Sequence, residues 1–329
     1  MIRSLLKPSS LLKTIFVIAG LALFSQSHGE SYPNRAITWY VPFAAGGGSD
    51  LMTRVVVQDL DKILGQSMVV DNRPGGATSI MASQLAKGSK DGYEVGSLDA
   101  STVTTLPVIR TKLPYDTEKS FSYVSGLAIF PWILVVNSSV PANNLEELIA
   151  LAKQRPGELT YGSPSATGRA RLGMERFQEA AGIELLHIPY NGDAPAVIDL
   201  VGGQIDMFLG NPAALKPYLD SGRLKGIAAA RMNRLELLPD LPTFDEQGLK
   251  GFEAYSWQAA AVPSGTPQHI IEQLNEVLHT ALTEGESVQK LTELGLQPFP
   301  TSPAEVEKLA REELAENRVW IEKLGWEIN

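Results

Sequence analysis

The clearest indication of the fold is a run of residues near the N-terminus: Ile37-Thr38-Trp39-Tyr40-Val41-Pro42-Phe43-Ala44-Ala45-Gly46-Gly47-Gly48. Its first five residues are β-branched or aromatic, as in buried strands. Apolar residues at helical spacing follow over residues 49–64, and Gly65 is a typical helix stop. A strand that passes through a glycine-rich loop into a helix is the start of a βαβ unit.

The same alternation of strand and helix patterns continues along the chain. Strands are expected at residues 68–70 and 94–98 on either side of a helix that ends near Lys87, which predicts parallel pairing with right-handed crossovers. A second series of strands is expected at 133–136, 159–162, 185–188, 205–209 and 224–229. An extended stretch at 253–262 and helices at 267–282, 287–294 and 303–324 close the chain, and the last two helices are expected to pack on the first unit.

This order predicts an α/β protein of two domains with a ligand cleft between them. Domain 1 is discontinuous and takes residues 32–130 plus 255–329, whereas domain 2 takes residues 131–254. The hinge crossings are expected near 125–135 and 252–260. A small ligand most often binds between domains, so the site is expected there.

Residues 1–27 are predicted to be a cleaved signal peptide. Arg3, Lys7 and Lys13 precede an apolar run at 14–24, and small and polar residues follow it. The run is shorter than the roughly 20 residues that span a bilayer, although an uncleaved N-terminal anchor is the alternative. The mature product is expected to be soluble and periplasmic, and the absence of cysteine excludes a lipid anchor on that residue.

Composition excludes several classes of function. With 329 residues, 44% hydrophobic and 20% charged, the chain is globular and able to bury a large core. Its formal net charge of −9 provides no general basic field, so nucleic acid is not expected as a partner. The lack of cysteine also excludes disulfides, thiol nucleophiles and cysteine-based metal sites.

Catalytic patterns are weak. Of the four histidines, His28 lies at the cleavage site, His187 lies in an apolar strand, and His269 and His279 are not at the i, i+4 spacing that chelates a metal. The string GSPSA at 162–166 departs from the GxSxG nucleophile elbow. We therefore expect no enzyme, no cofactor and no metal. A secreted hydrolase using Ser163 or Ser165 is the alternative from another class, although the sequence shows no base for it.

Small-residue loops at helix starts are the main functional signal. Residues 44–50 and 161–171 both leave a strand and enter a helix, where N–H groups and the helix dipole favour an anion. Loops at 98–102 and 190–195 hold the same strand-end position. Because ligands of open α/β sheets bind outside the carboxyl ends of strands, the four loops are expected to share one site. A tight βα turn that happens to be rich in glycine is the alternative for residues 44–50.

A set of short motifs spans the mature chain in a fixed order: PFAAGGGSD (42–50), VDNRPGG (70–76), DGY (91–93), GELTYGS (157–163), HIPYNGDAPA (187–196), GGQIDM (202–207), LPDLPT (238–243) and VPSGTP (262–267). In these motifs the chain resembles the Bug family of extracytoplasmic solute receptors, the substrate-binding components of tripartite tricarboxylate transporters. The resemblance implies a type II periplasmic-binding-protein fold, in which two domains close like a Venus flytrap.

The resemblance also implies a function. The chain is expected to capture a small organic acid and deliver it to the membrane permease subunits of such a transporter, and to act as a monomer. A sensor receptor that presents its liganded form to a signalling partner is the alternative. The implied ligand-binding residues are Phe43, Ala44, Ala45, Gly46, Gly47, Gly48, Ser49, Ser163, Pro164, Ser165, Ala166, Thr167 and Gly168 for the proximal carboxylate, and Ser101, Thr102, Tyr190, Asn191 and Asn211 for the walls or distal end.

Two departures from the family pattern bear on the ligand. Gly210 stands where many members have an Asp that could pair with a ligand ammonium, which disfavours an amino acid. Arg171 stands where many relatives have a His, and Arg169 replaces a smaller residue. An arginine that reaches the cleft would bind a second carboxylate through two hydrogen bonds, so Arg171 joins the ligand-binding set and a dicarboxylate is favoured. In the alternative, both arginines lie on the helix surface.

Overall fold

The computed structural model describes residues 32–190 and 192–326. The chain divides into two units, residues 1–34 and 35–329, and the described strands and helices belong to the second. The predicted signal peptide and the candidate ligand residue Asn191 lie outside the described residues.

The first sheet has the order β11-β4-β10-β3-β1-β2. The strands β1 (Ile37–Val41), β2 (Met68–Asn72) and β3 (Glu94–Asp99) pair in parallel, as the sequence predicts. The connection from β1 to β2 contains α2 (Gly48–Leu64), and that from β2 to β3 contains η1 (Gly76–Thr78) and α3 (Ser79–Ala86). The short helices α4 (Ala100–Thr104) and α5 (Leu106–Ile109) follow β3.

The second sheet has the order β7-β6-β8-β5-β9. Its strands are β5 (Ile133–Asn137), β6 (Thr160–Ser163), β7 (Leu186–Pro189), β8 (Met207–Gly210) and β9 (Leu224–Ala229). The strand β6 is parallel to β7 and β8, whereas β5 is antiparallel to β8 and β9. Its helices are α6 (Leu145–Gln154), α7 (Arg169–Ala181), α8 (Asp193–Val201) and α9 (Pro212–Asp220). We call the parts built on the two sheets the first and second lobes.

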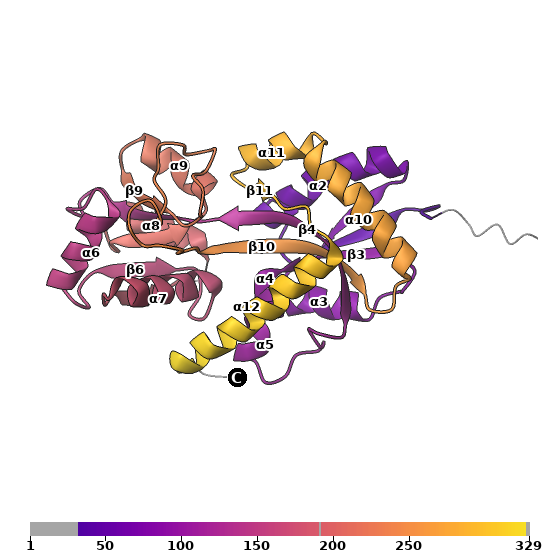
Figure 1. Cartoon of the computed structure of the whole chain (residues 1–329), viewed down its shortest axis with the longest axis horizontal. Helices are drawn as coiled ribbons and strands as arrows, with labels where there is room; N and C mark the ends of the chain where they lie inside the picture. Colours follow the sequence, from indigo (N-terminus) through magenta and orange to yellow (C-terminus); the bar gives the residue numbers. More distant parts are fainter. Residues whose placement is uncertain (1–31, 191, 327–329) are drawn as a thin grey trace, which may run out of the picture. The chain divides into compact units, whose positions relative to one another are not determined.

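A long antiparallel pair leads from one lobe to the other (Figure 1). The strand β4 (Phe121–Pro131) pairs with β10 (Tyr255–Pro263) from end to end, and β5 of the second lobe begins two residues after β4 ends. Sequence analysis did not predict β4 as a strand. Two register shifts interrupt the pair, and such irregularities bend strands and increase their twist. The division into two domains at these strands stays a prediction.

The C-terminal helices cover the first sheet, as expected from their lack of strands. The helices α10 (Gln268–Thr283) and α12 (Pro303–Lys323) pack on β4, and α11 (Ser287–Glu293) packs on α2. Between α11 and α12, the short strand β11 (Gln297–Pro298) pairs with β4 at the edge of the sheet.

The helix α12 also binds α7 of the second lobe. Arg176 Nη2 lies 2.7 Å from Glu316 Oε1, and Lys323 pairs with Glu179. Leu172 of α7 packs in one apolar cluster with Ile321 and the following Trp326. The C-terminal helix therefore holds the two lobes together beside the β4–β10 pair.

A largely buried ion pair between Arg169 and Glu313 also joins the lobes. Arg169 Nη1 lies 2.9 Å from Glu313 Oε2, and the two side chains are only 14% and 15% exposed. The same guanidinium donates to the Thr104 hydroxyl and to the Tyr255 carbonyl. Trp257 Nε1 donates to Glu313 at 3.0 Å, so both charges are fixed by further hydrogen bonds.

We predict that Glu313→Gln lowers the free energy of unfolding by about 3 kcal/mol, because it leaves a buried guanidinium without its counter-charge. The measurement is the urea unfolding midpoint. Glu312→Gln is the matched control, since Glu312 lies one residue away in a long, exposed pair with Lys308 and should change stability by no more than about 0.5 kcal/mol. Equal effects of the two substitutions would show that the buried pair contributes nothing special.

Candidate functional site

The glycine-rich loop runs from the end of β1 to the start of α2. Residues 43–48 are exposed, whereas Ser49 and Asp50 are buried. Gly46 has a φ of +81°, which favours glycine, and the Gly47 N–H donates to the Ala44 carbonyl at 3.3 Å. Gly47 is the N-cap of α2 and has no side-chain cap, so the first N–H groups of the helix lack an intrahelical partner. The loop therefore presents the positive end of a helix dipole to an exposed surface.

Ser49 contributes to this loop through its backbone rather than its hydroxyl. The hydroxyl donates to Gln258 Oε1 at 2.7 Å, and both side chains are buried. Sequence analysis missed Gln258, although a Gln among the alanines of an otherwise apolar strand is a signal for a specific partner. Gln258 also lies opposite Asp99 in the β10–β3 pair, which brings the loops after β1 and β3 together on the first lobe.

The loop after β6 has its carbonyl groups held by the protein. The Pro164 carbonyl accepts the Gly192 N–H at 2.9 Å, and the Ser165 carbonyl accepts the Ser163 hydroxyl at 2.7 Å. The next carbonyl, of Ala166, accepts Arg171 Nη1 at 2.5 Å. Three consecutive acceptors are thus paired. The following helix α7 begins at an N-cap glycine without a side-chain cap, so the loop again favours an anion.

The loops after β6 and β7 are joined to each other. The Tyr190 N–H donates to the Ser163 carbonyl at 2.9 Å, and the contact of Gly192 with Pro164 continues this pairing beyond the strands. The structure therefore brings the four predicted loops together as two pairs, one on each lobe.

The two arginines have protein partners. Arg171 binds Glu175 at 3.2 Å and the Ala166 carbonyl, and its guanidinium lies 4.7 Å from the centroid of the Trp326 ring. Arg169 reaches the first lobe and is held by Glu313. The side chains of Arg169 and Arg171 are 14% and 24% exposed, so both are largely buried, and neither guanidinium is free. A ligand contact by Arg171 stays a prediction, but the arginines no longer supply the argument for a dicarboxylate.

Ser163 forms a pair with His187 that resembles a nucleophile and its base. The Ser163 Oγ lies 2.6 Å from His187 Nε2, so the structure shows a histidine that sequence analysis did not connect with this serine. However, Ser163 is fully buried and donates its hydroxyl hydrogen to the Ser165 carbonyl. The imidazole Nε2–H is then the donor to Ser163 and does not act as a base toward it. The pair ties β6 to β7 rather than preparing an attack.

Burial, with a smaller effect of the nearby Arg171 charge, lowers the pKa of His187 to about 4, although Glu175 opposes the shift. An unfolded histidine has a pKa near 6.5, so the unfolded state binds the extra proton between about pH 6.5 and pH 4. Stability contributed by the neutral His187 is therefore present above this window and is lost as the pH falls through it.

The free energy of unfolding of the wild type should fall between pH 7 and pH 4, and we predict that this fall is about 1 kcal/mol smaller in His187→Gln. The value is kept this small because the imidazole is only half-buried. The measurement is the thermal unfolding midpoint at several pH values. His279, exposed on α10, provides the histidine control as His279→Gln. A variant whose pH profile coincides with that of the wild type would contradict the assignment to His187.

The remaining candidates have mainly structural contacts. Asp99 accepts the Ser101 N–H at 2.9 Å as the N-cap of α4, and the fully buried Thr102 shares a 2.7 Å hydrogen bond with Thr78. The Tyr190 hydroxyl donates to Asp199 at 2.9 Å. Asn211 caps α9 by accepting the N–H groups of Ala213 and Ala214. Their roles toward a ligand stay predictions.

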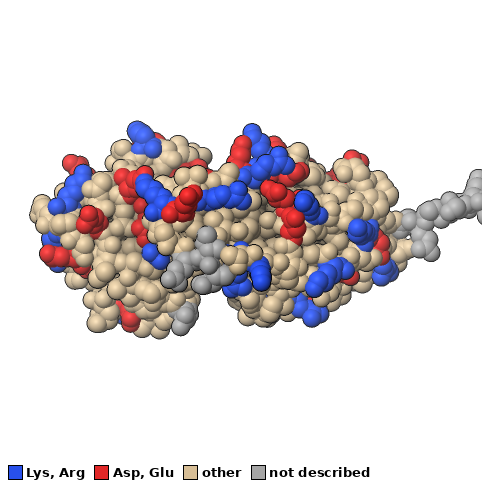
Figure 2. All heavy atoms as spheres, turned by 90° about the horizontal axis from the view of Figure 1, so that it is seen from below, with Lys and Arg blue, Asp and Glu red and all other residues tan. Residues whose placement is uncertain are grey.

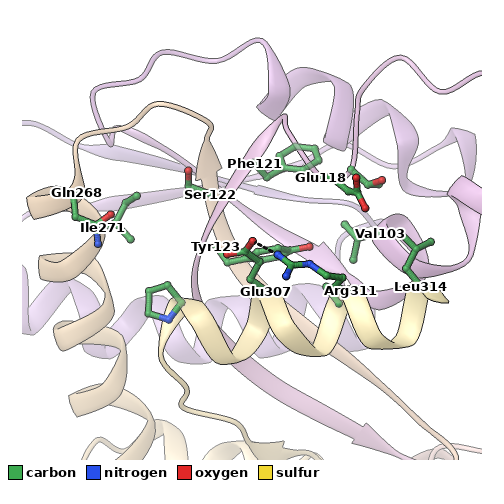
Figure 3. A pocket seen from close by; sticks show the side chains of 13 residues that line it. Val103, Glu118, Phe121, Ser122, Tyr123, Gln268, Ile271, Glu307, Arg311 and Leu314 are labelled. Carbon is green, nitrogen blue, oxygen red and sulfur yellow. Dashed lines mark hydrogen bonds and ion pairs between the residues drawn. The ribbon is translucent and has the colours of Figure 1, made fainter. Parts of the chain in front are cut away.

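A hollow of about 360 Å³ lies elsewhere on the first lobe, between β4, α10 and α12 (Figure 3). Val103, Phe121 and Leu314 are among its apolar lining residues. Arg311, on its rim, pairs with Glu307 at 2.6 Å, so this charge is used within the protein. None of the four loops lines this hollow, and we do not assign the site to it.

Other kinds of site find no support in residues 32–190 and 192–326. Within these ranges, no helix combines the length and apolar character needed to cross a membrane, and no three His, Asp or Glu side chains cluster as metal ligands. On the face shown in Figure 2, acidic and basic side chains are interspersed rather than gathered in a basic field.

Two lobes joined by a crossing strand pair, each with small-residue loops at helix starts, define a solute-binding protein. The profile described as "Tripartite tricarboxylate transporter family receptor" matches residues 52–326. The chain belongs to this family of solute-binding receptors, which includes the Bug proteins, and it is therefore a receptor and not an enzyme.

Individual relatives agree with this assignment. Protein BugT of Bordetella pertussis is 33% identical over 300 residues, covering 90% of this chain and 91% of that protein. An R. palustris protein solved with adipate is 33% identical with a TM-score of 0.78, covering 89% of this chain and 98% of the other. MatC from Rhodopseudomonas palustris, solved with bound malate, is 26% identical with a TM-score of 0.72, covering 88% and 100%. The fold is accordingly the two-domain fold of type II periplasmic binding proteins.

Proposed function

We propose that this protein is a periplasmic receptor that captures a small carboxylate between its two pairs of loops and delivers it to a tripartite tricarboxylate-type membrane transporter. The observation that carries the proposal is the loop after β6. Three consecutive carbonyl groups there accept hydrogen bonds from the protein, while the N–H groups at the start of α7 have no intrahelical partner. The start of α2 offers the same donors from the first lobe.

A dicarboxylate is the ligand we favour. The relatives solved with adipate and malate each hold a dicarboxylic acid, and the first is 33% identical to this chain. The main-chain donors of the two helix starts hold the proximal carboxylate. Ser101, Thr102, Tyr190, Asn191 and Asn211 stay the candidates for the walls or distal end. Arg171 also stays a candidate contact, although its guanidinium already binds Glu175 and the Ala166 carbonyl.

A ligand that contacts both lobes favours closure of the lobes around it. A ligand shifts the open–closed equilibrium by its difference in affinity for the two states, so contacts from both lobes favour the closed state. We propose the hinge at the two register shifts of the β4–β10 pair, because such irregularities bend strands. We propose that the receptor acts as a monomer. A sensor that presents the closed form to a signalling partner would use the same chemistry, and loss of ligand uptake on deletion of the receptor distinguishes transport from sensing.

We predict that adipate or malate raises the thermal unfolding midpoint of the mature protein by several degrees. A ligand at 100 times its Kd stabilises the native state by about 2.7 kcal/mol. Hexanoate, amino acids and sugars at equal concentration serve as comparisons, and native mass spectrometry first establishes that no ligand remains from purification. Stabilisation by sugars or amino acids but by none of adipate, malate and hexanoate would refute the proposal.

We predict that Gly47→Val weakens binding of adipate at least tenfold with little change in stability, because its side chain occupies the exposed loop where the carboxylate would lie. Calorimetric titration measures the Kd. Gly202→Val is a close control: both glycines have φ near −78°, and an added Cβ would meet one backbone carbonyl at 3.3 Å in each case. Equal affinities of the two variants would remove the glycine-rich loop from the site.

A further inference from the structure

The glycine-rich loop is supported from beneath by one buried carboxylate. Asp50 is the third residue of α2, and the residue is only 2% exposed. Its Oδ2 accepts the Gly46 N–H at 2.8 Å, and Arg54 Nε lies 3.0 Å from each of its oxygens. This contact fixes the one loop residue whose positive φ gives the backbone its turn.

Asn72 extends this support to the other end of the loop. It is the last residue of β2 and lies opposite Val41 at the end of β1. Its Nδ2 donates to Asp50 Oδ1 at 3.0 Å and to the Phe43 carbonyl at 2.9 Å. Arg54 Nη2 donates to the side-chain oxygen of Asn72, Oδ1, at 3.3 Å, which closes the network. The Phe43 carbonyl and the Gly46 N–H are thus both tied to this one network.

The carboxylate of Asp50 lies next to a proposed anion site, where its negative charge would repel the ligand. Its presence there therefore needs an explanation. The hydrogen bonds of Arg54, Gly46 and Asn72 outweigh the effect of burial and hold the pKa of Asp50 below its ordinary value, so it is charged at neutral pH. Arg54 compensates that charge. With its charge compensated, Asp50 acts on the site mainly through geometry. Its carboxylate binds the Gly46 N–H and so fixes the loop, while the N–H groups at the start of α2 stay directed to the ligand.

We infer that Asp50 is a positioning residue, which together with Arg54 and Asn72 holds the glycine-rich loop in the conformation that binds the ligand carboxylate. The inference rests on the proposed function for the loop as the binding site and for the identity of the ligand. Electrostatics and positioning predict opposite results for Asp50→Asn. Removal of a negative charge alone would strengthen the binding of an anion, whereas loss of the support would weaken it.

The experiment compares Asp50→Asn with Asp59→Asn. Asp59 is a matched control because it lies on the same helix, is 5% exposed, and accepts the Ser287 N–H at 2.8 Å far from the loop. Two quantities are measured: the adipate Kd, and the amide hydrogen exchange of residues 43–48 in the ligand-free protein. We expect Asp50→Asn to raise the exchange of the loop and to raise the Kd at least tenfold. Asp59→Asn should lower the melting temperature similarly, yet leave both quantities within twofold of the wild type.

A folded Asp50→Asn protein with unchanged loop exchange, or with an unchanged or tighter Kd for a ligand that the wild type binds, overturns the inference. If Asp50→Asn does not fold, Asn72→Ala decides the question, because it removes the bond to the Phe43 carbonyl from a half-exposed position. It should raise loop exchange and weaken binding by roughly threefold or more. If the wild type binds no carboxylate, the proposed function fails, while the exchange comparison still tests Asp50.

Discussion

A carboxylate site built from main chain depends on one constraint: every peptide group carries both a donor and an acceptor, and only the donor attracts an anion. A loop becomes a selective site when its oxygens are taken up elsewhere. In this protein the Ser163 hydroxyl and the Arg171 guanidinium take up the oxygens of the second loop, and Asn72 takes up the Phe43 oxygen of the first. The polar atoms of these side chains are thus bonded to main-chain oxygens of the loops, so their polar character alone does not mark them as ligand contacts.

The helix α7, which begins directly after the second loop, is also bonded to the opposite lobe. Arg169 is the first residue of α7, directly after the loop that binds Arg171, and its guanidinium lies among Glu313 and Thr104 of the first lobe. The β4–β10 pair, the ion pairs between α7 and α12 and the Arg169 contacts thus all join the same two lobes.

Local features of the sequence were sufficient for much of this description. The strand at 37–41, the parallel order of the first three strands and the glycine-rich helix start follow from neighbouring residues alone, and the structure contains them. The strand β4 was missed because its serines and glycine break the alternation that marks a strand. Local features of the sequence could not predict which side chains bond to each other. Ser49 meets Gln258 across 209 positions, and Arg169 meets Glu313 across 144, so no local pattern indicates that either side chain is already engaged.

Packing also explains why Gly210 could not simply be exchanged for the Asp that the resemblance to the family implies at this position. A Cβ added at Gly210 would lie 2.3 Å from the ring of Phe208, a residue that is 1% exposed in the core of the second lobe. An aspartate at this position therefore requires Phe208 to move or to become smaller, at the cost of a well-packed core. The adjacent Asn211 is fixed as the cap of α9 and cannot supply a charge in its place. Gly210 and Phe208 thus depend on each other in packing. Without a rearrangement of Phe208, the end of β8 has no room for a carboxylate that could pair with an ammonium group.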